Sequence, residues 1–289
     1  MKKSPRLPLW QSVFWIVGSA LFVSGASHKI IQCYVIKKPK KESPALQYVS
    51  YIVQTGFQKE ALHSDYLAEL LDLSKDSPTL FSQFQEEEAE KKLLDSPLFQ
   101  EAKVAKIAPN IVYVDYTIRK PIAWASDFLN TVVDKEGYLF PMAPFFSPKK
   151  LPEIYLGKEG IQASYLEKEP SFKQPLQGKY MDLALSVLDF FYGYEKDFFS
   201  LRRIDVSQSF FPTLGKKGIV VTLENELIDP RGTSTHFLKL STVHYAKEIA
   251  NYFKLRPHLL EIEKEKLLMG EPLKERIIDL RLPQLAFVD

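Results

Sequence analysis

An uncharged stretch near the start of the chain limits the folds that are open to it. Residues 7–27 read LPLWQSVFWIVGSALFVSGAS and contain no Asp, Glu, Lys or Arg. At ~1.5 Å per residue, a helix of this length crosses the ~30 Å hydrocarbon core of a bilayer. Trp10 and Trp15 have the amphipathic rings that favour a membrane interface. We therefore expect a single transmembrane helix that runs from Leu7 through Trp15 to Ser27.

A secretory signal peptide is the alternative for this segment. Lys2, Lys3 and Arg6 give it a basic start, and the small residues 24–26 resemble a cleavage site. The length of the uncharged stretch favours an uncleaved anchor, so residues 1–28 are expected to form a short cytoplasmic tip and the membrane helix. The lone Cys33 excludes an intramolecular disulfide.

Charge is distributed unevenly between the two ends of the chain. Residues 1–41 contain eight Lys or Arg and no acid, which leaves 30 basic against 36 acidic residues in 42–289. An acidic body argues against nucleic-acid binding, because the positive charge lies outside the expected folded part. Residues 29–45 are expected to form a charged linker. This linker contains five lysines, and three basic residues precede the uncharged stretch. By the positive-inside rule, such a count would place the body in the cytoplasm. Large translocated domains obey this rule poorly.

Beyond the linker, residues 46–123 predict a small α+β domain. The segment 96–123 contains two strand-like runs separated by Pro109-Asn110, and Val112, Val114, Tyr116 and Ile118 alternate with more polar residues. This period of two is typical of a half-buried strand. A strand over 46–55 and helices near 64–71 and 82–94 precede it. We interpret the acidic run in the second helix as a solvated face.

Residues 124–289 predict a second domain with a mainly antiparallel, curved sheet and flanking helices. Apolar stripes at helical spacing occur over 180–192 and 243–253, and strand-like runs occupy 201–206 and 218–227. A turn is expected at 224–226. The charged, helix-prone segment 256–275 has no predicted role.

No pattern in the sequence indicates catalysis. The five histidines form no i, i+4 pair, and neither a phosphate-binding Gly-rich loop nor a Gly-x-Ser-x-Gly turn is present. Asp229, Ser234 and His236 lie close together in sequence, but a catalytic triad is assembled by the fold and not by sequence neighbours. We interpret 229–236 as a hairpin turn, and predict no catalytic, cofactor-binding or metal-binding residue.

Several motifs, in order, carry a resemblance to a known family. They are the Pro109-Asn110 turn, the strand that runs into Arg119-Lys120-Pro121-Ile122-Ala123, the Asp-x-x-Gly turn at 134–137, the segment LPEIYLG at 151–157 and the strand IDLRLP at 278–283. Together they resemble the FtsQ/DivIB family of bacterial cell-division proteins, which have a POTRA domain followed by a β domain. The resemblance implies a POTRA domain over 46–123 and an FtsQ-type β domain over 124–289.

The resemblance also implies a function. It predicts a non-catalytic scaffold of the divisome, held in the inner membrane at the septum, with its body in the periplasm. The implied partners are FtsB- and FtsL-like coiled-coil proteins and the lipid bilayer, with septal peptidoglycan synthases as further candidates. Two other interpretations stay open: a POTRA-containing factor for outer-membrane protein assembly or secretion, and a membrane-anchored envelope hydrolase.

Candidate partner-binding residues lie in both domains. The last strand, 277–282 with its continuation through Phe287, is expected to be an exposed edge with no tail to cover it. An open edge can accept a partner strand. From the resemblance, Arg281 is expected to donate to an acidic partner helix, and Leu282, Leu285 and Phe287 to act as apolar anchors. The alternative is an ordinary strand whose apolar residues are core. In the first domain, Tyr113 is the candidate contact, beside Ile111 and Asp115; the alternative is that both faces of this strand are structural.

Overall fold

The computed structural model describes residues 47–56, 61–146, 149–164, 173–194, 199–213, 215–228, 231–283 and 285–289. The expected membrane helix, with Leu7, Trp15 and Ser27, and the expected linker lie outside these residues. None of the helices in the described ranges combines the length and the apolar composition needed to cross a membrane. Residues 48–289 form one compact unit.

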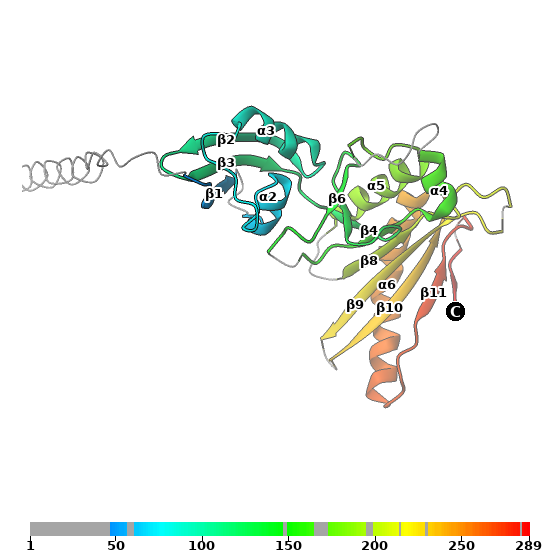
Figure 1. The fold of residues 1–289 in the computed structure, drawn as a ribbon. Helices are drawn as coiled ribbons and strands as arrows, with labels where there is room; N and C mark the ends of the chain where they lie inside the picture. Colours follow the sequence, from blue (N-terminus) through cyan, green and yellow to red (C-terminus); the bar gives the residue numbers. More distant parts are fainter. Residues whose placement is uncertain are drawn as a thin grey trace, which may run out of the picture. The chain divides into compact units, whose positions relative to one another are not determined.

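A three-stranded sheet forms the first part of this unit (Figure 1). Its strands β1 (Tyr51–Gly56), β3 (Ile111–Ile118) and β2 (Phe99–Ile107) lie in that order, with helices α2 (Ser64–Leu70) and α3 (Glu86–Asp95) between β1 and β2 in sequence. β3 alternates as the period of two predicts: Val112, Val114, Tyr116 and Ile118 are buried, together with Leu67 of α2 and Leu93 of α3. This part of the sequence prediction is confirmed.

A nine-stranded sheet forms the second part. In spatial order its strands are β12 (Phe287–Val288), β11 (Arg276–Asp279), β10 (Arg231–Leu240), β9 (Ile219–Ile228), β8 (Ser200–Asp205), β7 (Glu153–Tyr155), β4 (Ala123–Ala125), β5 (Thr131–Val133) and β6 (Leu139–Pro141). The pairs β4–β7, β7–β8 and β10–β11 are parallel, and the other neighbours are antiparallel.

The expected fold class is therefore wrong in its description of this sheet, which is mixed. The physical reason is the position of the helices. α4 (Gly157–Ser164) and α5 (Lys179–Tyr192) lie between β7 and β8 in sequence, and α6 (Tyr245–Leu268) lies between β10 and β11. A helical crossover brings the chain back to start its next strand in the same direction, whereas a hairpin reverses it. The sequence predicts flanking helices over 180–192 and 243–253 and no helix at 157–164, and the crossover role of all three helices is not apparent from it.

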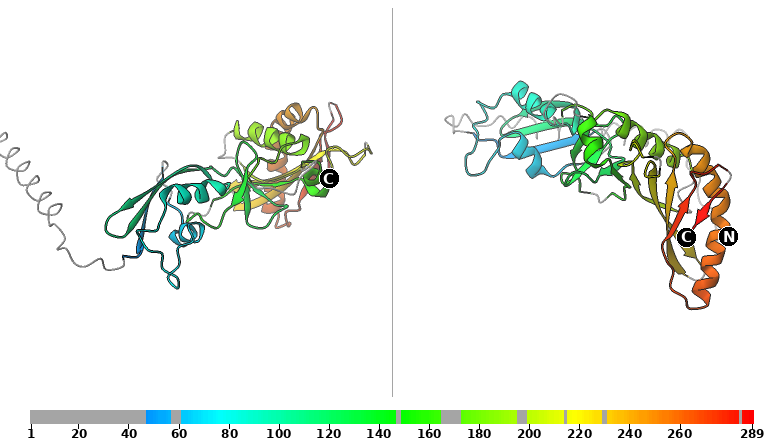
Figure 2. Two further views of the ribbon diagram at one scale, coloured as in Figure 1. Left: turned by 45° about the horizontal axis from the view of Figure 1, so that its top comes forward. Right: turned by 90° about the vertical axis from the view of Figure 1, so that its right-hand side faces the viewer.

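α6 is a single helix that lies against β10 (Figures 1 and 2). The sequence predicted a helical stripe that ends near Phe253 and a separate charged segment from Arg256, but the helix continues through Pro257. Buried polar contacts on both sides of this proline explain its continuity. The hydroxyl of Tyr252 lies 2.8 Å from Nδ1 of His236, and Oε1 of Glu263 lies 3.0 Å from Nε2 of the same ring. One buried histidine on β10 thus contacts the helix before and after the proline.

The same network corrects two turn predictions. Glu224, Asn225 and Glu226 lie inside β9, and the amide of Asn225 donates to the Tyr252 hydroxyl over 3.4 Å. Ser234 and His236 lie inside β10 rather than in a turn. Burial raises the pKa of Tyr252 to about 12, and its hydroxyl shares a hydrogen bond with Nδ1 of His236. Nε2 of the same ring shares a hydrogen bond with Glu263, whose carboxylate Arg276 also contacts.

Arg119 contacts both parts of the unit from the end of β3. Its guanidinium group donates to Oδ2 of Asp134 and to Oε2 of Glu136 at 2.8 Å each, and stacks 3.4 Å from the ring centroid of Tyr138. Asp134 also closes the turn between β5 and β6, because its Oδ1 accepts the amides of Glu136 and Tyr138. Gly137 completes this turn at φ 89°, a backbone conformation that other residues rarely adopt.

Candidate interaction site

The C-terminal strand differs from the open edge that the sequence predicts. β11 covers only Arg276–Asp279 and lies between two neighbours, with β10 parallel on one side and β12 antiparallel on the other. β12 pairs Phe287 with Asp279 and Val288 with Ile278, and the amide of Asp289 donates to the carbonyl of Ile277. The chain therefore folds back and covers its own edge strand. The expectation that no tail covers this edge is wrong.

Apolar side chains between and on these two strands face outward. Ile278 and Leu280 are fully or almost fully buried, but the three predicted anchors remain exposed: Leu282 by 60%, Leu285 by 67% and Phe287 by 65%. Leu280 still pairs with β10 through its amide beyond the end of β11, whereas Leu282 does not share the buried face of Ile278 and Leu280. The alternative, in which these apolar residues belong to the core, therefore holds for Ile278 and Leu280. It does not hold for Leu282, Leu285 and Phe287.

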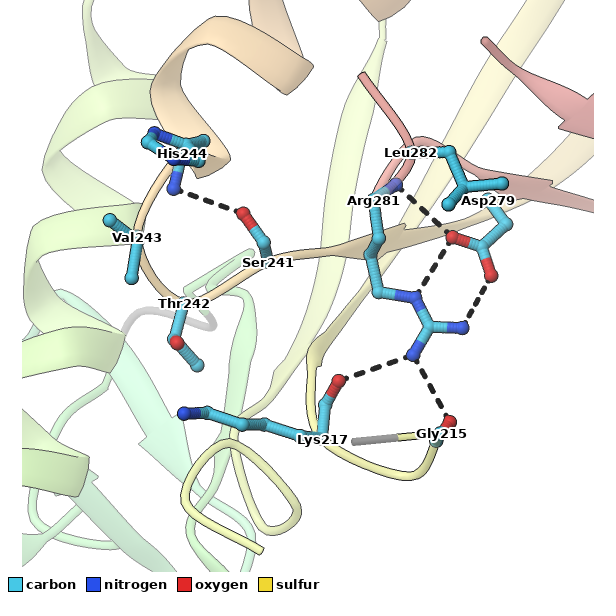
Figure 3. Close-up of a pocket in the computed structure, with 9 residues that line it drawn as sticks. All are labelled: Gly215, Lys217, Ser241, Thr242, Val243, His244, Asp279, Arg281 and Leu282. Atoms are coloured by element: carbon cyan, nitrogen blue, oxygen red, sulfur yellow. Dashed lines mark hydrogen bonds and ion pairs between the residues drawn. The ribbon is translucent and has the colours of Figure 1, made fainter. Parts of the chain in front are cut away.

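A hollow of ≈ 580 Å³ lies beside this segment (Figure 3). Its walls come from three places: the loop at Gly215 and Lys217, the start of α6 with its preceding loop, and the end of β11. Val243, exposed by 74%, and Leu282 add apolar surface to it. Hydrogen bonds to α6 fix the loop before this helix, because the buried carboxylate of Glu248 accepts hydrogen bonds from both the amide and the hydroxyl of Ser241. The hollow thus has one firmly held wall next to exposed apolar side chains.

Arg281 is already engaged within the chain. Its Nε and Nη2 donate to the two carboxylate oxygens of Asp279, and its Nη1 donates to the carbonyls of Gly215 and Lys217 at 3.2 and 3.1 Å (Figure 3). A guanidinium group has five N–H donors, so these contacts use most of them. The prediction that Arg281 presents a free donor to a partner needs correction. In the structure this side chain ties the 215–217 loop to the end of β11.

The electrostatics of this pair are consistent with a stable internal contact. The hydrogen bond from Arg281 is the largest factor that lowers the pKa of Asp279, and partial burial opposes it. The same hydrogen bond raises the pKa of Arg281. Asp279 is therefore ionised at neutral pH, and a partner carboxylate would have to compete with it for the guanidinium group.

Tyr113 lies on the outer face of the three-stranded sheet, away from the buried residues of β3. The hydroxyl of Thr55 donates to Oδ1 of Asp115 over 2.8 Å, which leaves its oxygen to accept from the Tyr113 hydroxyl 2.9 Å away. Tyr113 is thus half-buried and hydrogen-bonded. It is separate from the C-terminal surface, so the structure does not bring the predicted contact residues into one site.

The structure gives the Ser234 and His236 cluster no access to a substrate. Both residues are almost completely buried, and His236 is held between Tyr252 and Glu263. In the described ranges no group of three or more His, Cys, Asp or Glu residues is arranged to hold a metal ion.

Sequence reasoning missed several residues of the C-terminal surface. Lys217, Ser241 and Val243 line the hollow, yet they lie far from Leu282 in sequence and belong to no recognisable motif. Val243, beside a helix start, was the one residue that the sequence could have marked as part of this surface. It was instead counted in the apolar stripe over 243–253 and expected in the core.

No known family model matches the chain, and no curated protein is similar to it at a significant level.

Proposed function

We propose that this protein is a non-catalytic scaffold of the bacterial division machinery, which binds membrane-anchored coiled-coil proteins of the FtsB and FtsL type. The observation that carries the proposal is the group of exposed apolar side chains, Leu282, Leu285 and Phe287, next to a preformed hollow at the edge of the nine-stranded sheet. Clusters of large apolar side chains beside a concave surface are typical of protein-binding sites.

The motif order described above supports the choice of partner class. It relates the strand 278–283 to the partner-binding strand of the FtsQ/DivIB family. In this proposal the uncharged residues 7–27 anchor the protein in the cytoplasmic membrane, residues 1–6 face the cytoplasm and residues 28–289 lie outside it. Protease added to spheroplasts should then digest the body, and protection of the body until lysis would contradict this topology.

The contacts of Arg281 determine how such a partner would be held. Because Asp279 occupies the guanidinium group, the apolar anchors provide most of the affinity, and a partner acid contributes only by sharing or replacing the Asp279 contact. Arg281→Glu would place two carboxylates side by side and release the 215–217 loop, so this variant would alter the site itself. A substitution at an exposed anchor is the cleaner test.

The test is a calorimetric titration of the full chain in detergent micelles with FtsB- and FtsL-type ectodomains. Leu285→Asp should weaken binding by about tenfold or more, because a charge replaces one of the three exposed apolar anchors. Leu268→Asp is the matched control. Leu268 is exposed by 73%, against 67% for Leu285, but lies at the end of α6 outside the proposed surface. Equal affinities for the two variants would contradict the proposal.

A further inference from the structure

One edge of the three-stranded sheet is closed by side chains. In the antiparallel pair of β2 and β3, backbone amides of β2 point alternately toward β3 and away from it. The outward amides of Val104 and Lys106 donate to the carboxylates of Glu90 and Glu86. These two glutamates belong to the acidic run that the sequence analysis interpreted as a solvated face. These contacts occupy the outward donors in the second half of β2 and hinder the addition of a strand there.

The opposite edge is formed by β1. Directly before β1, Leu80 pairs with Tyr48 and the carbonyl of Thr79 accepts the amide of Val49, so the part of this edge that stays open among the described residues begins at Tyr51. The amide of Ser50 donates to the carbonyl of Asn110, and the register continues in parallel along β3. In a parallel pair, alternate residues direct both backbone groups to the same side. Tyr51, Val53 and Thr55 therefore present their amides and carbonyls away from β3. The sequence of β1, YIVQTG, has none of the charged residues that usually protect an edge.

The side chains beside this edge are graded from apolar to polar. Across the outer face of the sheet, the register aligns Tyr51 with Ile111 and Ile107, and Val53 with Tyr113 and Ala105. Tyr51 is exposed by 64% and Val53 by 45%. The third row aligns Thr55 with Asp115 and Lys103. Two apolar rows are thus followed by one polar row that contains an exposed carboxylate.

Asp115 provides the charge that selects a partner. Among the described residues it accepts the hydroxyl of Thr55 and forms no ion pair. Adjacent strands lie about 4.8 Å apart, so a residue added beside Thr55 is about 10 Å from the β3 backbone. A lysine or arginine side chain spans this distance, whereas an acidic side chain there would be repelled.

We propose that the β1 edge binds an extended segment of another protein by strand addition, and that this segment carries two apolar residues and a basic residue at alternate positions. The apolar side chains pack beside Tyr51 and Val53, and the basic side chain pairs with Asp115. The backbone of the segment takes the free amides and carbonyls of β1. This surface is separate from the C-terminal one, so the inference goes beyond the proposed function and does not depend on it.

A synthetic peptide tests the proposal on the full chain in detergent micelles. The probe is fluorescein-labelled KTVTVTK, which has the required alternation in both strand directions, and its uncharged twin is QTVTVTQ. Fluorescence anisotropy should show saturable binding of KTVTVTK. Val53→Pro removes one outward amide and no hydrogen bond to β3, and should weaken binding by at least about fivefold. Asp115→Asn should weaken the binding of KTVTVTK by up to about fivefold and leave the binding of QTVTVTQ unchanged.

A matched pair of variants localises the site to one edge. Val53→Lys and Ala105→Lys add the same charge to the same row and face of the sheet, but on opposite edge strands. Val53→Lys should abolish binding and Ala105→Lys should not, with circular dichroism confirming that both variants are folded. Equal effects of the two variants, or no saturable binding to the wild type, would overturn the proposal. A dimer of the wild type that Val53→Lys disperses, without probe binding, would instead assign the edge to a second copy of this chain.

Discussion

Arg119→Ala should destabilise the protein more than any other single substitution at the junction of the two sheets. The side chains of Arg119 and Asp134 are only 11% and 7% exposed, so their ion pair is shielded from solvent. Arg119 also stacks on Tyr138 and donates through Nε to the carbonyl of Pro97. Its second carboxylate partner, Glu136, is 63% exposed and adds little.

The magnitude follows from these contacts. A hydrogen bond to a charged group contributes about 1.5 kcal/mol or more, and a partly buried cation–π contact about 1 kcal/mol. Asp134 keeps the amides of Glu136 and Tyr138 as donors, so it is not left without partners. We therefore expect a loss of about 3 kcal/mol, which corresponds to roughly 8 °C in Tm for a unit of this size.

Thermal denaturation of the full chain in detergent, followed by circular dichroism, measures this effect. Arg119→Lys keeps the positive charge but neither the planar guanidinium group nor its stacking on Tyr138. It should lose about half as much stability as Arg119→Ala. Lys120→Ala is the control, because the neighbouring Lys120 is exposed and should change stability by no more than about 0.5 kcal/mol. A Tm for Arg119→Ala equal to that of Lys120→Ala would refute the reasoning.

Two further predictions concern stability. Burial alone would raise the pKa of Glu263, but hydrogen bonding, chiefly from His236, lowers it below its usual range. Its contribution is therefore present above about pH 4.3 and is lost as the pH falls through the lower, folded-state pKa. Glu263→Gln should cost about 3 kcal/mol at pH 7, and urea titrations should show this difference narrowing in acid. Val114→Asp should cost several kcal/mol, because it places an unpaired charge in a fully buried position. The same titration should show the exposed Val53→Asp close to wild type, and similar losses for both would be inconsistent with the assigned faces of the sheet.

Local patterns in the sequence predicted the first sheet well. The alternation in 111–118 correctly identifies Val112, Val114 and Tyr116 as buried, because the two faces of a strand repeat every two residues whatever the strand pairs with. The order of strand, helix, helix, strand and strand was also found, since each element carries its own periodicity.

Contacts between distant segments were not predictable in this way. The acidic residues of α3 looked alike in sequence, yet Glu86 and Glu90 reach the amides of β2 while Glu87 and Glu88 remain exposed. The apolar stripe that ends near Phe253 and the charged segment from 256 looked like separate elements, but α6 continues through both, with buried contacts to His236 on either side of Pro257.

The candidate site shows the same division. Leu282, Leu285 and Phe287, the anchors that the family resemblance suggests, have exposed side chains. The return of β12 onto β11 and the internal pairing of Arg281 depend on segments that come together only in the folded chain.

Depletion of the protein in growing cells tests the central proposal most directly. Cell length, chromosome segregation and outer-membrane protein levels would be followed by microscopy and quantitative blotting. A division scaffold predicts that depleted cells keep growing and segregating their chromosomes but fail to divide, and that wild-type protein restores division while Leu285→Asp restores it poorly and Leu268→Asp fully. Normal division with a fall in outer-membrane proteins would contradict the account.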